Sequence, residues 1–175
     1  EDSTLHQSGS GTVVYPDAKG FHVLTCRHNF ETQDGKVGAG TITVHLGDET
    51  YAATIAHYSK KYDLAVLRVR TKDKLKGATL AGADDYPEGR LVEKLGFPDW
   101  KRTYGTGACL DWHTTDKSGV KSFACSIKAK VGDSGCGVFR SKDKKLVGVL
   151  RGGGEGAVCV RLAHVHEFLK EAGLE

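Results

Sequence analysis

Short apolar runs separated by turn residues are the feature that most constrains how this chain can fold. β-Branched side chains and alternating polarity predict strands, and glycine, with 23 residues against 3 prolines, favours tight turns between them. Strands are expected in the first part of the chain over residues 11–15, 21–26, 41–46, 51–57 and 63–70. They are expected again over residues 91–96, 103–113, 121–128, 136–140, 146–151 and 157–162.

Two segments depart from this strand pattern. The polar stretch from Thr71 to Gly89 carries turn residues and charges, and it is the best linker candidate. Near the end of the chain, apolar residues recur at helical spacing from Ala163 to Ala172, and Gly173 stands where a helix is expected to stop. The pattern therefore predicts an all-β chain with two small barrels or sandwiches, one in each half, and a short C-terminal helix.

Composition and charge exclude several classes of protein. Hydrophobic residues make up 39% of the 175 residues, which is enough for a packed core. The net charge of +3 is small, and nucleic-acid binding would need a concentrated basic patch. No apolar run approaches the ~18 residues of a membrane span. Because neither an initial Met nor a signal peptide is present, we expect a processed product or an excised domain.

The five cysteines are an odd number, so at least one thiol must be free. No CxxC pair and no zinc-ligand spacing occurs, and no metal is implied. A hairpin centred near Lys117 would place Cys109 opposite Cys125, with Cβ atoms ~4.5–5.5 Å apart, somewhat wider than in a disulfide. The odd count favours a reduced pair. The compartment stays open, with a secreted or cell-envelope location favoured.

The sharpest local signal is the string Gly132-Asp133-Ser134-Gly135. Glycines on both sides allow a tight turn that presents the Ser134 hydroxyl outward. The backbone N–H groups of Gly132 and Ser134 could then point at one oxygen, as a tetrahedral acyl-transfer intermediate requires. By itself the string is weak evidence, since Asp, Ser and Gly are also ordinary turn residues.

Two further residues complete a possible catalytic set. His28 follows directly after the apolar strand 21–26, where a side chain can face a cleft. Asp63 opens the apolar strand 63–70, where a carboxylate can be partly buried and aimed at an imidazole. Taken singly, His28 is more simply explained as a loop histidine, and Asp63 as a cap at the start of a strand.

In this order, the three motifs resemble those of the trypsin-like serine protease family. The resemblance extends over nearly the whole chain: Gly11-Thr12-Val13-Val14 is similar to the opening strand, and Leu95-Gly96-Phe97-Pro98 to a turn of bacterial high-temperature-requirement proteases. Leu146-Val147-Gly148-Val149 is similar to the substrate-binding strand. The resemblance implies two six-stranded antiparallel β-barrels, residues 1–80 and 81–175, with the helix closing the second. It also implies peptide or protein substrates and no cofactor.

Some residues depart from the family pattern. Cys136 stands where the family usually has a second glycine after the serine. The cysteine pairs around the histidine of vertebrate members are absent, which favours a compact bacterial or viral type. The chain begins Glu1-Asp2-Ser3 rather than with the Ile or Val whose freed amine pairs with the acid before the serine in trypsin-type zymogens. Asp133 must therefore find another partner.

The resemblance also implies the residues that would bind substrate. These are Lys128 at the base of the primary pocket, the strand Leu150, Arg151 and Gly152, and Gly153 and Ala157 along the walls. If Lys128 and Arg151 face the pocket, cleavage after Glu or Asp is expected; if they face solvent, small aliphatic residues are expected instead.

Three rival readings remain at this stage. A catalytically silent module could keep the fold and bind peptides or proteins, and a viral polyprotein protease would share the chemistry. A serine esterase is disfavoured because the GxSxG elbow is interrupted by Cys136.

Overall fold

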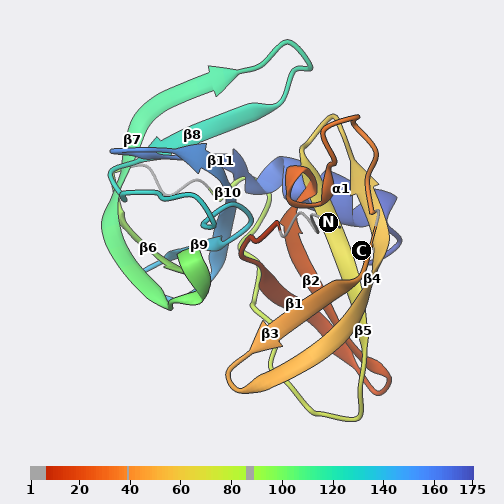
Figure 1. Cartoon of the computed structure of the whole chain (residues 1–175). Helices are drawn as coiled ribbons and strands as arrows, with labels where there is room; N and C mark the ends of the chain where they lie inside the picture. The colour runs from red at the N-terminus through yellow and green to blue at the C-terminus, as the bar shows by residue number, and fades with distance from the viewer. Residues whose placement is uncertain (1–6, 39, 86–88) are drawn as a thin grey trace.

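The computed structural model describes residues 7–38, 40–85 and 89–175, which form two groups of strands lying side by side (Figure 1). The first is a sheet with the order β1-β2-β5-β4-β3, and the second is a closed barrel with the order β10-β11-β8-β7-β6-β9. The first sheet consists of β1 (Thr12–Asp17), β2 (Gly20–Cys26), β3 (Ile42–Leu46), β4 (Glu49–Ser59) and β5 (Leu64–Arg70). The barrel consists of β6 (Leu91–Gly96), β7 (Thr103–Thr115), β8 (Lys121–Cys125), β9 (Gly137–Arg140), β10 (Leu146–Gly153) and β11 (Ala157–Arg161).

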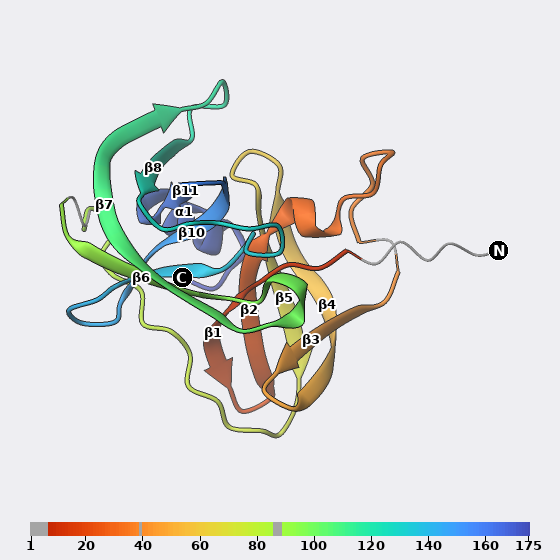
Figure 2. The same cartoon turned by 60° about the vertical axis from the view of Figure 1, so that its left-hand side comes forward.

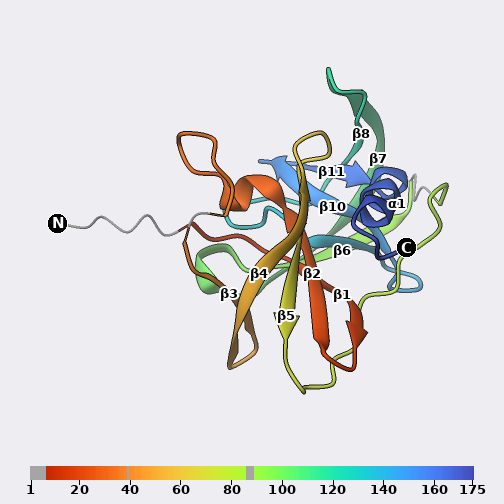
Figure 3. The same ribbon diagram turned by 90° about the vertical axis from the view of Figure 1, so that its right-hand side faces the viewer.

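The first sheet forms from the five apolar runs expected in this part of the chain. Its strands pair antiparallel. Along β4, half-buried side chains alternate with exposed ones, as expected of a strand with one face toward the core. The expectation of six strands in this half is wrong for the described residues: five strands pair, with β1 and β3 at the two edges (Figure 3). The physical reason is in the sequence, which provides no sixth apolar run here.

The barrel contains the six expected strands, and the hairpin between β7 and β8 extends beyond it (Figure 2). The turn between these two strands lies at Asp116–Gly119, as the sequence predicts. The N–H of Asp116 donates to the carbonyl of Val120 at 3.1 Å and closes it.

Cys109 lies opposite Cys125 as expected, but the register next to the turn differs from the predicted one by two: His113 pairs with Phe123, and an irregularity between Cys109 and His113 brings the cysteines opposite each other. All five cysteines are buried, and none forms a disulfide. Strand β8 ends at Cys125 rather than at residue 128.

The helix α1 (Leu162–Glu171) joins the two groups of strands. Its buried Phe168 stacks on His57 of β4, with ring centroids 5.4 Å apart, and lies edge-on to Tyr62 at 6.5 Å. The Tyr62 hydroxyl also donates to Glu167 of the helix at 3.0 Å. One apolar core consequently runs through both groups and the helix. No helix in the described ranges has the length and apolarity needed to cross a membrane.

Replacing Phe168 with alanine should destabilise both groups of strands together. The side chain is fully buried, so Phe168→Ala should lower the free energy of unfolding by about 3–5 kcal/mol. Urea denaturation followed by circular dichroism measures this. Leu91→Ala is the control, because Leu91 is 65% exposed and its loss should change stability by less than about 0.5 kcal/mol. Equal effects of the two substitutions would contradict the shared core.

Candidate active site

Strand pairing in the first sheet brings His28 and Asp63 together. Strands β2 and β5 are antiparallel neighbours, with Cys26 opposite Leu64, so the end of one strand lies beside the start of the other. His28 lies two residues beyond this pair, in the short 3₁₀ helix η1 (Arg27–Phe30), and Asp63 lies one residue before it. Residues 35 positions apart in the sequence therefore meet at one end of the sheet.

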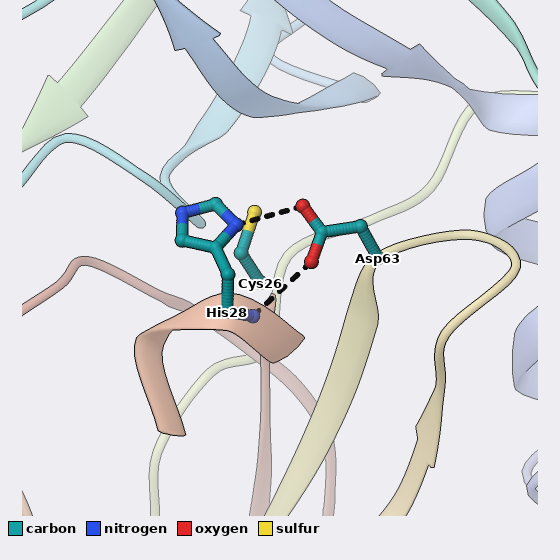
Figure 4. A group of neighbouring side chains, drawn as sticks. All are labelled: Cys26, His28 and Asp63. Carbon is teal, nitrogen blue, oxygen red and sulfur yellow. Dashed lines mark hydrogen bonds and ion pairs between the residues drawn. The ribbon is translucent and has the colours of Figure 1, made fainter. Parts of the chain in front are cut away.

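Both oxygens of the Asp63 carboxylate are used to hold His28. One oxygen accepts from the His28 backbone N–H at 3.1 Å, and the other lies 2.7 Å from Nδ1 of the ring (Figure 4). The carbonyl of Asp63 also accepts from the N–H of Arg27 at 3.1 Å. Asp63 has φ of 55°, a left-handed conformation that Asp tolerates better than most residues. The geometry fixes the ring orientation and leaves Nε2 turned away from the carboxylate.

Cys26 lies beside this pair, and the three side chains could place ligand atoms within 4.8 Å of one another (Figure 4). Metal binding would require a thiolate from the cysteine. Burial, however, raises the pKa of the Cys26 thiol well above its usual range, and the thiol donates to the carbonyl of Leu150 at 3.3 Å. A neutral thiol and an imidazole already bonded to a carboxylate form a poor metal site.

The loop carrying Ser134 is bonded to the first sheet through its backbone. The carbonyl of Ser134 accepts from the N–H of Ser10 and from the side chain of Asn29, both at 2.9 Å. Asn29 is the residue after His28, and its amide also donates to Thr25 at 3.0 Å. The serine loop and the histidine are thus joined by one hydrogen-bonded network across the two groups of strands. Asn29 and Ser10 were not predicted from the sequence, although Asn29 directly follows His28.

Glycine is required on both sides of Ser134. Gly132 has φ of 94°, and a Cβ there would lie 2.8 Å from Cα of Pro98. Gly135 has φ of 92°, and a Cβ there would lie 2.2 Å from the Thr25 hydroxyl. No side chain fits at either position, so glycine is needed at 132 for the loop to pack on the segment after β6 and at 135 for it to approach the first sheet.

Alternate backbone N–H groups of this loop are free. Asp133 N–H donates to the carbonyl of Lys130 at 3.0 Å, and Gly135 N–H donates to the carbonyl of Leu150 at 2.7 Å. Within the described residues, the N–H groups of Gly132 and Ser134 donate to no acceptor, and the half-buried Ser134 hydroxyl makes no hydrogen bond. Two free amide donors beside a free hydroxyl are the arrangement that acyl transfer uses.

The partner that Asp133 needs is Lys94 of β6. The Lys94 ammonium contacts one carboxylate oxygen of Asp133, with the two side chains only 4% and 0% exposed. The sequence carried no signal for this pairing, because a lysine in a strand of alternating polarity is ordinarily a surface residue.

The expected substrate-binding residues lie on the barrel at different depths. Lys128 is 75% exposed and pairs with Glu155 at 3.0 Å, while Arg151 lies 3.3 Å from Asp116. Leu150 is buried, and its N–H and carbonyl are bonded to Cys136 and Gly135. Ala157 is also buried, opposite Cys125.

The outer edge of β10 is the part of this region that is open. Strand β9 pairs with Leu146–Val149, and its pairing ends before Arg151. Gly152 and Gly153 pair with β11 on the other edge only. An unpaired strand edge offers backbone donors and acceptors to an extended peptide.

Comparisons with known proteins agree with this architecture. The family model described as "Trypsin-like peptidase domain" matches residues 9–149. No curated protein sequence matches the chain significantly.

Several solved structures have the same fold. The Rv3671c protease from M. tuberculosis H37Rv, as an inactive serine-to-alanine mutant, superposes with a TM-score of 0.79 at 21% identity, over 94% of this chain and 81% of that one. A second inactive form of Rv3671c gives 0.75 at 23% identity, over 94% and 83%. The HtrA-type protease AlgW with a decapeptide gives 0.76 at 21% identity, over 91% of this chain and half of that one.

A closed six-stranded barrel beside a second sheet, together with the match to the peptidase domain, defines a serine endopeptidase of the chymotrypsin-like fold. The match over most of its length shows that this chain belongs to the trypsin-like peptidase family. Its substrates are therefore peptides or proteins.

The hydrogen bonds to the Asp116 carboxylate make stability depend on pH at low values. Hydrogen bonds from Ser118 above all, with those from Val120 and Arg151, lower the pKa of Asp116 to about 2. A lowered pKa contributes stability that is full above the ordinary value of about 4 and is lost as pH falls through the lowered one. Asp116→Asn should therefore cost about 1 kcal/mol at neutral pH, and this difference should vanish between about pH 4 and pH 2.

Urea denaturation of the two proteins across this pH range measures the difference. Asp48→Asn is the matched control, since Asp48 is exposed at the β3–β4 turn and should show no such trend. A cost of Asp116→Asn that stayed constant down to the lowest pH would contradict the assignment.

Proposed function

We propose that this endopeptidase cleaves peptide bonds with Ser134 as nucleophile, His28 as general base and Asp63 as the residue that orients the imidazole. The observation that carries the proposal is the two-point bond from Asp63 to His28, opposite a serine whose own N–H and that of Gly132 are free. The network through Asn29 supports the assignment, because it ties the histidine segment to the serine loop.

In the proposed mechanism the carboxylate of Asp63 accepts a hydrogen bond from Nδ1–H of His28 and stays ionised, which leaves Nε2 as the proton acceptor. His28 removes the Ser134 proton as the hydroxyl attacks the substrate carbonyl, and then donates it to the departing amine. The N–H groups of Gly132 and Ser134 stabilise the negative oxygen of the tetrahedral intermediate. Water, activated by the same imidazole, hydrolyses the acyl-enzyme. Hydrogen bonds of this kind often shorten only when substrate is bound, which fits the unbonded Ser134 hydroxyl.

Substrate would bind as an extended strand along the open edge of β10. Arg151, Gly152 and Gly153 would supply the backbone contacts, and Lys128 would lie toward the primary side chain. Since Leu150 has both backbone groups bonded internally, its part in this scheme is to hold β10 against the serine loop rather than to bond substrate.

We further propose a small preference for Glu or Asp before the scissile bond. Both candidate cations already have carboxylate partners, Glu155 for Lys128 and Asp116 for Arg151. The Lys128–Glu155 pair is exposed, and such pairs contribute only about 0–1 kcal/mol, so a substrate carboxylate can replace Glu155. Because Glu155 and Asp116 compete with the substrate carboxylate for these cations, the expected preference for an acidic over a neutral side chain is only about two- to fivefold.

The triad is tested by covalent labelling and kinetics. Ser134→Ala should abolish labelling by a fluorophosphonate without altering the circular dichroism spectrum. Asp63→Asn should lower kcat by about 10⁴, since the imidazole would adopt the wrong tautomer, and His28→Ala should be at least as severe. Labelling of Ser134→Ala at the wild-type rate would contradict the assignment. Absence of labelling in the folded wild type would favour a catalytically silent peptide-binding module instead.

The substrate preference is tested with matched peptides that carry Glu, Gln, Ala or Lys before the scissile bond. We expect kcat/KM for Glu to exceed that for Gln by about two- to fivefold, and Lys128→Ala to abolish the difference. Lys142→Ala removes the same charge from an exposed turn and should leave the preference intact. Equal rates for Glu and Gln in the wild type, or a preference that survives loss of Lys128, would refute this part of the proposal.

A further inference from the structure

The ion pair between Lys94 and Asp133 is buried immediately behind the proposed catalytic serine. Asp133 precedes Ser134 in the chain and is completely buried, and Lys94 enters from β6, 39 residues away in the sequence. Removing two charges from water is costly, and a buried carboxylate left without its counter-charge costs several kcal/mol more. The conformation of Asp133 therefore depends strongly on the lysine.

The surrounding backbone makes room for this pair. Gly96 is the residue of β6 two positions after Lys94, and a Cβ on it would lie 2.0 Å from an oxygen of Asp133. Glycine at this position thus leaves space for the carboxylate that the lysine meets.

Asp133 holds the serine loop through nearly all of its polar atoms. The carboxylate oxygen that meets Lys94 also accepts from the N–H of Lys130 at 2.8 Å. The backbone N–H donates to Lys130, and the carbonyl accepts from the N–H of Cys136 at 3.0 Å. Within the described residues, the other carboxylate oxygen is buried without a partner. The two ends of the loop, Lys130 and Cys136, are therefore both hydrogen-bonded to Asp133.

The fixed Asp133 determines where the neighbouring amides point. Its own N–H turns inward to Lys130, so the N–H groups on either side, those of Gly132 and Ser134, are left for a ligand. The carbonyl of Gly132 is fixed as well, by the Ser10 hydroxyl at 2.7 Å. If the carboxylate lost its partner and moved toward solvent, the peptide groups on both sides would rotate with it.

We propose that Lys94 is a positioning residue for the oxyanion-binding amides. Its ammonium holds Asp133 inward, and Asp133 in turn keeps the N–H groups of Gly132 and Ser134 directed at one point. The cation comes from within β6, so the loop needs no freed amino terminus to take its active shape. This inference rests on the proposed catalytic role of Ser134, and it adds a residue that touches neither substrate nor the reacting atoms.

The test replaces Lys94 with methionine, which keeps the length of the side chain and removes the charge. Lys94→Met should lower kcat by about 10²–10³, the effect of losing one oxyanion donor, with KM changed by less than about threefold. A peptide boronate, whose tetrahedral adduct uses the same amides, should lose affinity in proportion to kcat. A purely structural lysine would lower the melting temperature and leave both quantities unchanged in the folded protein.

Two further variants keep the test decisive. Lys144→Met is the matched control, because it removes a lysine from an exposed ion pair with Glu93 of the same strand and should leave kcat unchanged. If Lys94→Met does not fold, Lys94→Met/Asp133→Asn replaces the pair by neutral side chains of similar shape. It should fold and still lose at least about tenfold in kcat and boronate affinity. Wild-type turnover in the double variant would overturn the inference.

The inference and the proposed function can fail separately. A wild type that is labelled at Ser134, together with an equally active Lys94→Met, would refute only the role of Lys94. The backbone ¹H–¹⁵N signals of Gly132 and Ser134 test the loop directly, even in a protein that cleaves no peptide. They should move in Lys94→Met and stay in place in Lys144→Met, and unmoved signals in Lys94→Met would refute the inference.

Discussion

The antiparallel pairing of β2 with β5 is the constraint on which the site depends. Register in a sheet is set by which side chains face which core, and a slip of one residue would turn Leu24 or Val66 out of the core shared with the barrel and toward the smaller apolar cluster on the other face. The same register decides that the residues after β2 meet the residue before β5. The geometry of His28 and Asp63 is thus a consequence of burying apolar side chains, and the two polar groups need only be placed at the ends of the strands.

The second half of the site depends on contact between the two groups of strands. Ser134 reaches the first sheet through hydrogen bonds to Ser10 and Asn29 and through the close approach of Gly135 to Thr25. The shared apolar core and the helix α1 hold the two groups at this distance. Packing energy, which is not specific to the site, therefore keeps the serine and the histidine on facing surfaces.

Much of this arrangement could be predicted from the sequence, because local patterns determine it. Alternating runs placed the strands to within a few residues, and the turn after Asp116 was predicted correctly. The irregularity in β7 that brings Cys109 opposite Cys125 carried no signal in the sequence. What could not be predicted depends on partners distant in sequence. The pattern around Lys94 is that of an exposed strand residue, and only the fold shows that its side chain points inward to Asp133. The carboxylates that pair with Lys128 and Arg151 could not be predicted either, because these partners also lie far away in the sequence.

Buried ion pairs are usually poor sources of stability, which bears on why this one exists. Apolar side chains of similar volume often stabilise a core as well as a buried pair does, since the desolvation penalty offsets the attraction between the charges. A need for stability alone would therefore not explain a lysine in the interior of β6, nor the glycine at position 96 that makes room for the carboxylate. What an apolar pair could not do is hold a carboxylate that also binds the backbone of the serine loop at Lys130. The charge pair is best understood as a means of fixing the direction of two amide groups, at some cost to the stability of the core.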